Sequence, residues 1–172
     1  MAKAPLLSSL IRQSSRVAGE NTGGAAGNVD HLDRKALEQE LARRVDGEVR
    51  FERGTLGLYA TDSSNFREVP IGVVIPKTPD AVVEAHRICS RYGAPILNRG
   101  GGTSLSGETV NFAVVIDHSK YLTRIGDPDT SRRLVTVQPG AINEQVNKKT
   151  GKVNLVFGPD SSRRTCPPTT AA

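Results

Sequence analysis

The clearest hydrophobic pattern in the chain is an apolar run, then an amphipathic segment, then a second apolar run. Residues 69–75 are apolar and rich in β-branched side chains, as expected for a strand covered on both faces. Thr78 is a good N-cap with Pro79 at the first helical position, and apolar residues then recur at helical spacing until Gly93. Residues 95–97 form a second short strand. This unit predicts parallel pairing with a right-handed crossover.

Weaker patterns flank this unit on both sides. Asp30 or Asp33 is expected to cap a helix that ends near Arg44 and carries Leu37 and Leu41 on one face. Glycines and prolines divide the rest of the chain into short segments. These are a strand at 49–51, an irregular stretch at 54–68, strands at 112–116, 122–125, 133–138 and 153–157, and a helix at 141–149.

Charge and composition narrow the class of partner. The 172-residue chain has a net charge of +5, which favours an anionic partner such as nucleic acid, acidic lipid or a phosphorylated cofactor. Aromatic residues make up 4% and tryptophan is absent, so little in the sequence can stack on exposed bases. We therefore expect no nucleic-acid partner. Retention on DNA that falls steeply with added salt would be the sign of that alternative.

Cysteines and apolar runs bear on location. Cys89 and Cys166 give neither a disulfide framework nor a metal-ligand spacing, so we expect no metal and a reducing, cytoplasmic location. No apolar run is long enough for a transmembrane segment, and peripheral membrane contact is left open. Residues 1–19 are basic and serine-rich, which fits either a mitochondrial presequence or a disordered terminus.

The segment with the clearest chemistry is the glycine-rich stretch after the strand at 95–97. Consecutive glycines leave no side chains between the backbone and a ligand, and their N–H groups can form an anion-binding nest. Hydroxyl donors and one full positive charge surround them, and no acid interrupts the stretch. The segment therefore suits a diphosphate. Its candidate binding residues are Arg99, Gly100, Gly101, Gly102, Thr103, Ser104 and Ser106.

Two well-known phosphate loops do not fit this segment. Gly102 and Gly107 have the spacing of a Walker loop, but Glu108 stands where its lysine must be. The dinucleotide fingerprint of the Rossmann fold needs a third glycine at the position of Leu105. The remaining alternative is a flexible surface turn. The position after a strand–helix–strand unit favours phosphate binding over that alternative.

The glycine-rich stretch resembles the pyrophosphate loop of the vanillyl-alcohol-oxidase superfamily, in the branch of glycolate oxidase and D-lactate dehydrogenase flavoproteins. The resemblance covers about residues 54–160, and several motifs in the same order make it specific. These further motifs lie at residues 59–64, 69–76, 114–117, 135–140 and 157–160.

The resemblance implies an α+β fold of the PCMH type, with FAD held between two subdomains. Residues 69–117 would form the small parallel sheet of the first subdomain, and residues 122–158 would begin the mixed sheet of the second. Pro139 and Gly140 would bind on the flavin side. Some relatives attach the flavin to a histidine in the glycine loop, where this chain has Thr103, so we expect non-covalent FAD.

The resemblance and the composition together suggest four regions. The family pattern stops near residue 160, which suggests a frameshifted or truncated gene product, and a natural short protein with a disordered tail is the alternative. The regions are a disordered N-terminus at 1–29, an N-terminal helix and lead-in segment at 30–68, an incomplete FAD-binding PCMH-type domain at 69–160 and an irregular tail at 161–172.

The implied function is that of the FAD-binding domain of a flavin-dependent oxidoreductase acting on a 2-hydroxy acid such as D-lactate or glycolate. The alternative is a truncated, non-catalytic fragment or a module that binds nucleotide phosphate. In the family, the base and the cation that act on the substrate come from a cap domain with no counterpart in this sequence. His31, His86 and His118 have no neighbour in sequence that marks a catalytic pair, so we assign no catalytic residue.

Overall fold

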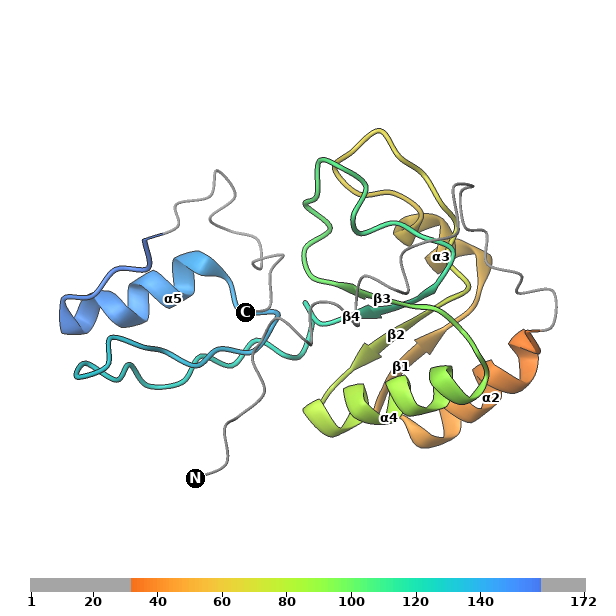
Figure 1. Ribbon diagram of the computed structural model, residues 1–172, viewed down its shortest axis with the longest axis horizontal. Helices are drawn as coiled ribbons and strands as arrows, with labels where there is room; N and C mark the ends of the chain where they lie inside the picture. Colours follow the sequence, from red (N-terminus) through yellow and green to blue (C-terminus); the bar gives the residue numbers. More distant parts are fainter. Residues whose placement is uncertain (1–31, 159–172) are drawn as a thin grey trace, which may run out of the picture. The chain divides into compact units, whose positions relative to one another are not determined.

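The computed structural model describes residues 32–158 (Figure 1). The described residues all belong to one compact unit. No helix in this described part is long and apolar enough to cross a bilayer. Several predictions concern residues outside it, namely the N-terminus at 1–29, the tail at 161–172, His31 and Cys166.

Four short strands form one sheet, β1 (Gly47–Arg50), β2 (Gly72–Pro76), β3 (Ile96–Arg99) and β4 (Val114–Asp117). Their order across the sheet is β1-β2-β4-β3. β4 runs parallel to both of its neighbours, and β1 lies antiparallel against β2. The sheet is therefore mixed, with its three parallel strands inside residues 69–117, as expected.

The helices are α2 (Arg34–Arg44), α3 (Arg53–Tyr59), α4 (Pro79–Arg91) and α5 (Asn143–Thr150), and a 3-10 helix η1 (Gly151–Val153) follows α5. Two caps predicted from sequence are confirmed. The Asp33 carboxylate accepts a hydrogen bond from the N–H of Ala36 at 2.9 Å, and the Thr78 hydroxyl accepts one from the N–H of Ala81 at 3.1 Å.

Helices cover both faces of the sheet (Figure 1). On one face, Leu37 of α2 and Ile88 of α4 are fully buried against side chains such as Val74. On the other, Leu56 of α3 packs against Val73 and its neighbours. Because alternate residues of a strand point to opposite faces, β2 must be apolar throughout to serve both cores. The predicted double coverage of this strand is confirmed.

The strands at either end of α4 do not pair directly, contrary to the expectation from the strand–helix–strand pattern. β4 lies between them, and Val114 pairs with Gly72 on one side and with Ile96 on the other. All four residues of β4 are buried, whereas β3 is only partly buried and forms an edge of the sheet. Burial on both faces therefore places β4 in the centre.

Helix α3 corrects the expectation of an irregular segment at 54–68. Local signals for this helix are weak, because it contains two glycines and its N-cap residue, Glu52, makes no side-chain capping bond. Leu56 is nevertheless buried against Val73 and Val115 of the sheet. Packing against the sheet therefore stabilises a helix that its own sequence does not specify.

Beyond β4, the chain forms a hairpin-like segment and then α5. The segments expected as strands at 122–125 and 133–138 do face each other, through backbone hydrogen bonds such as that from Gln138 to Arg124 at 2.8 Å. They form isolated bridges, at Ile125–Val137 and Asp129–Leu134, rather than continuous strands. The strand expected at 153–157 is wrong. The chain there leaves η1 through Asn154, which has a φ of 57°, and Val156 is 81% exposed with no strand beside it.

Candidate functional site

The glycine-rich segment lies in the loop between β3 and β4, at the carboxyl ends of the parallel strands (Figure 1). Arg99 ends β3 and pairs in register with Asp117, which ends β4. The loop thus begins at the edge of the sheet where ligands of α/β proteins bind. We call residues 100–109 the glycine loop.

Backbone donors at the start of the glycine loop have no acceptor among the described residues, and Gly102 among them is buried. Within residues 32–158, the N–H groups of Gly100, Gly101, Gly102 and Thr103 donate to no other described group. Gly102 has a φ of +63°, and the other three have no positive φ. A left-handed residue between residues of ordinary φ is the alternation that turns successive N–H groups toward one anion.

The segment that follows α3 anchors the glycine loop. The Asp62 carboxylate accepts hydrogen bonds from the Thr109 hydroxyl at 2.9 Å and from the Thr109 N–H at 3.4 Å. The N–H of Ser63 donates to the carbonyl of Gly102 at 3.2 Å. Burial acts to raise the pKa of Asp62, but hydrogen bonds from Ser64 and Thr109 outweigh it and lower the pKa. The anchor is therefore an ionised carboxylate at neutral pH.

Two of the predicted hydroxyl donors differ in their surroundings. Ser104 is 7% exposed, and its Oγ accepts hydrogen bonds from the N–H groups of Ser106 at 3.2 Å and Glu108 at 3.1 Å. This hydroxyl closes a turn within the loop. The side chain of Ser106 is exposed, although its N–H is used by that turn.

Arg99 points into the body of the protein. Its guanidinium donates to the carbonyls of Thr61 at 2.9 Å, Thr109 at 3.1 Å and Tyr59 at 3.4 Å. It also lies 5.2 Å from the centre of the Tyr59 ring, within the range of a cation–π contact. The arginine therefore connects β3 to the segments on both sides of the site.

Gly140 packs against the segment that follows β4, and that segment is bonded to Arg99, where the glycine loop begins. The N–H of His118 donates to the carbonyl of Arg99 at 3.0 Å. A Cβ added to Gly140 would lie 2.3 Å from the carbonyl oxygen of His118 and 2.9 Å from that of Leu122, so only glycine fits. Pro139 precedes it and is exposed. The described contacts join this turn to the end of β4, but not to Gly100–Ser104.

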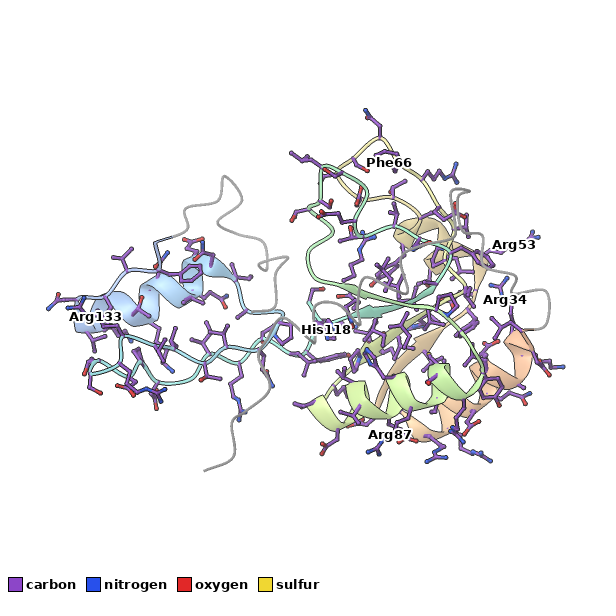
Figure 2. The ribbon with its side chains drawn as sticks, in the orientation of Figure 1. Arg34, Arg53, Phe66, Arg87, His118 and Arg133 are labelled. Carbon is purple, nitrogen blue, oxygen red and sulfur yellow. The ribbon has the colours of Figure 1, made fainter. Side chains whose placement is uncertain are left out.

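His118, to which the sequence assigned no catalytic role, is buried (Figure 2). Its Nε2 lies 3.0 Å from Oδ1 of Asn98, and its Nδ1 is buried with no hydrogen-bond partner among the described residues. Burial lowers the pKa of His118, and the nearby Asp117 only partly offsets that effect. The ring is therefore neutral at pH 7.

Sequence reasoning placed the glycine loop but not the residues that hold it. Tyr59, Asp62 and Thr109 contact the loop or Arg99 through the bonds described above. Tyr59 and Asp62 belong to the motif at 59–64. The resemblance therefore pointed to these two residues but implied no role for them. Phe66, at the tip of the same segment (Figure 2), covers Gly107, where an added Cβ would lie 2.7 Å from its ring.

Solved structures share this fold. An alkyldihydroxyacetonephosphate synthase matches with a TM-score of 0.65 and 18% identity, over 77% of this chain and 28% of that one. A p-cresol methylhydroxylase matches with a TM-score of 0.60 and 20% identity, over 70% of this chain and 25% of that one. The mixed sheet, its helices and the loop at its carboxyl edge form an α+β fold of the PCMH type.

Sequence comparison identifies the family. The model of the FAD binding domain family matches residues 70–170, more than half of the chain. The chain belongs to this family of flavin oxidoreductase domains, and the expected cofactor, FAD, is confirmed.

Two curated relatives illustrate the extent of the match. A D-2-hydroxyglutarate dehydrogenase of Haemophilus influenzae is 29% identical over 73% of this chain and 13% of its own length. A glycolate oxidase subunit GlcD of Bacillus subtilis is 28% identical over 74% of this chain and 28% of its own length. The chain thus spans a minor part of the relatives that it matches.

Proposed function

We propose that Gly100, Gly101, Gly102, Thr103 and Ser104 bind the pyrophosphate of FAD without a covalent bond. The observation that carries this proposal is the run of backbone N–H groups at the carboxyl end of β3 that donate to no other described group. Such amides stabilise a diphosphate directly. Thr103 has no ring nitrogen to form a flavin link, which supports non-covalent binding.

The remaining candidate residues have supporting roles in this proposal. The hydroxyl of Ser106, which is exposed, would bind a phosphate at the rim of the loop. Pro139 and Gly140 would border the flavin side, which the closeness of Gly140 to the end of β4 supports. The bound flavin supplies the acceptor of two electrons. The residues of this chain bind and orient it.

For the whole protein we propose oxidation of a 2-hydroxy acid such as D-lactate or glycolate in the cytoplasm. The names of the two bacterial relatives support this substrate class. The residues described here would form the site for the cofactor and not the site for the substrate. We assign no catalytic residue within residues 32–158. The absence of a nucleic-acid partner stays a prediction.

Titration of the purified protein with FAD and with riboflavin tests the proposed site, because riboflavin lacks the pyrophosphate and the adenosine attached to it. We expect FAD to bind with a yellow colour and riboflavin to bind at least ~100-fold more weakly, since paired charge-assisted hydrogen bonds are lost. Gly101→Asp introduces a carboxylate among the donors and should abolish FAD binding.

Gly151→Asp is the matched control, because it adds the same charge where an added Cβ meets nothing within 4 Å. Unchanged FAD affinity in Gly101→Asp would place the cofactor elsewhere. If ADP binds as tightly as FAD, the chain is a module for nucleotide phosphate rather than a flavin domain.

A further inference from the structure

We propose that Arg99 is a positioning residue that shapes the glycine loop and does not itself contact the phosphates. The inference rests on the proposed function for its ligand, although the loop geometry can be tested without FAD. The sequence predicts Arg99 among the residues that bind the phosphates; here its role is to hold the loop in shape.

The hydrogen bonds of Arg99 fix the course of two chain segments. Its Nη2 donates to Thr61 at 2.9 Å, and its Nη1 donates to Thr109 at 3.1 Å and to Tyr59 at 3.4 Å. These carbonyls belong to the end of α3, to the segment that follows it and to the far end of the glycine loop. A planar guanidinium can bond carbonyls in separate directions at once, and an ammonium cannot reproduce that fork.

The guanidinium also lies directly against the turn of the loop. A Cβ added to Gly102 would lie 2.4 Å from Nη2 and 2.9 Å from Cζ of Arg99. The side chain therefore supports the left-handed residue of the nest from the protein side. Carbonyls that accept from Arg99 face inward, and the N–H groups from Gly100 to Thr103 are left for the ligand.

Direct contact with phosphate would require these bonds to break. Hydrogen bonds to a charged group are among the stronger interactions in a folded protein, and here three converge with the face of the Tyr59 ring. A swing of Arg99 toward a ligand would also remove the atoms that lie under Gly102. The geometry thus favours support of the loop over binding of the anion.

Arg99→Lys and Arg99→Gln distinguish the two roles. If Arg99 positions the loop, lysine does not rescue, and both variants lower FAD affinity at least ~10-fold and by similar factors. If Arg99 binds phosphate as a charge, lysine retains affinity within ~2-fold of wild type and only glutamine fails, which would overturn the proposal. Arg67→Gln is the control, because it removes an exposed positive charge from the anchoring segment.

Amide chemical shifts of Gly100, Gly101 and Gly102 in the FAD-free protein give a second readout. We expect them to move in Arg99→Lys and to stay in place in Arg67→Gln. Unmoved shifts in Arg99→Lys would overturn the positioning role. Failure of the wild-type protein to bind FAD would instead overturn the proposed function, and these shifts would still decide the role of Arg99.

Two glycine variants keep the test open if the Arg99 variants do not fold. Gly102→Ala and Gly93→Ala both place alanine at a positive φ, +63° and +64°, but an added Cβ at Gly93 meets nothing within 4 Å. Backbone strain is therefore the same in both. We expect Gly102→Ala to lower the melting temperature by at least ~4 °C more than Gly93→Ala. Equal losses would show that the guanidinium does not support the loop.

Discussion

The phenolic hydroxyl of Tyr59 donates a hydrogen bond of 2.5 Å to Oδ2 of Asp117, joining the end of α3 to the end of β4. Burial raises the pKa of Tyr59, and the bond to Asp117 raises it further, so the phenol stays protonated throughout the physiological range. The same ring lies beside the guanidinium of Arg99. Tyr59 therefore connects the ends of both strands that flank the glycine loop.

Tyr59→Phe should lower the free energy of unfolding by about 1–3 kcal/mol, because the buried carboxylate of Asp117 loses a hydrogen-bond partner. Urea unfolding followed by circular dichroism would measure the change. Tyr121→Phe is the matched control, since that hydroxyl bonds the Glu48 carboxylate at an exposed position and its loss should cost less than ~1 kcal/mol. A larger loss in the control would contradict the importance of Tyr59.

Gly140→Ala should destabilise the protein by about 1–3 kcal/mol. The added methyl would meet the backbone oxygens of His118 and Leu122, which cannot move aside as a flexible side chain can. Gly57→Ala, in α3 with nothing within 4 Å, should instead stabilise by ~0.5–1 kcal/mol through helix propensity. Thermal unfolding of both variants checks the prediction, and opposite signs are expected. A neutral result at position 140 would contradict the close approach.

The thiol of Cys89 should be protected in the folded protein. Burial raises its pKa to about 11, so almost no thiolate forms at pH 8, and the side chain is inaccessible on α4. In a Cys166→Ser background, a disulfide reagent should react with Cys89 only after urea is added. Rapid labelling of the native protein would show that α4 detaches from the sheet.

Stability should fall as the pH drops below about 6.5. Burial lowers the pKa of His118 in the folded state, whereas the unfolded chain binds a proton near the ordinary value of 6.5. Between these two pKa values only the unfolded state is protonated, so acid favours unfolding. Urea unfolding at pH 7.5 and 5.5 measures the slope. His118→Gln should reduce it, and an equal slope in the variant would exclude His118 as its source.

Elements with strong local signals could be predicted from the sequence. Thr78 and Pro79 start α4 where expected, because the cap and the fixed proline φ act within a few residues. Helix α3 could not be predicted, because its stability comes from Leu56 packing on strands that follow later in the chain. The central place of β4 depends on the burial of both its faces. Apolar composition alone does not determine the order of strands within a sheet, so this place could not be predicted.

The candidate site was predictable to a similar degree. Three adjacent glycines after a strand mark the loop through their lack of side chains, which is a property of the residues themselves. The direction of the Arg99 side chain depends instead on the carbonyls of Thr61 and Thr109, which tertiary contacts bring within reach. The positive charge of Arg99 therefore suggested, from sequence, a bond to an anionic ligand. In the structure its hydrogen-bond acceptors are carbonyls of the protein itself.

The insertion of β4 between β2 and β3 has a kinetic consequence. Among the described strands β3 pairs only with β4, so its backbone gains no strand partner until the glycine loop has folded back. Loop closure must therefore precede completion of the sheet, and closure has an entropic cost. A ligand that binds the closed loop would therefore also stabilise the completed sheet.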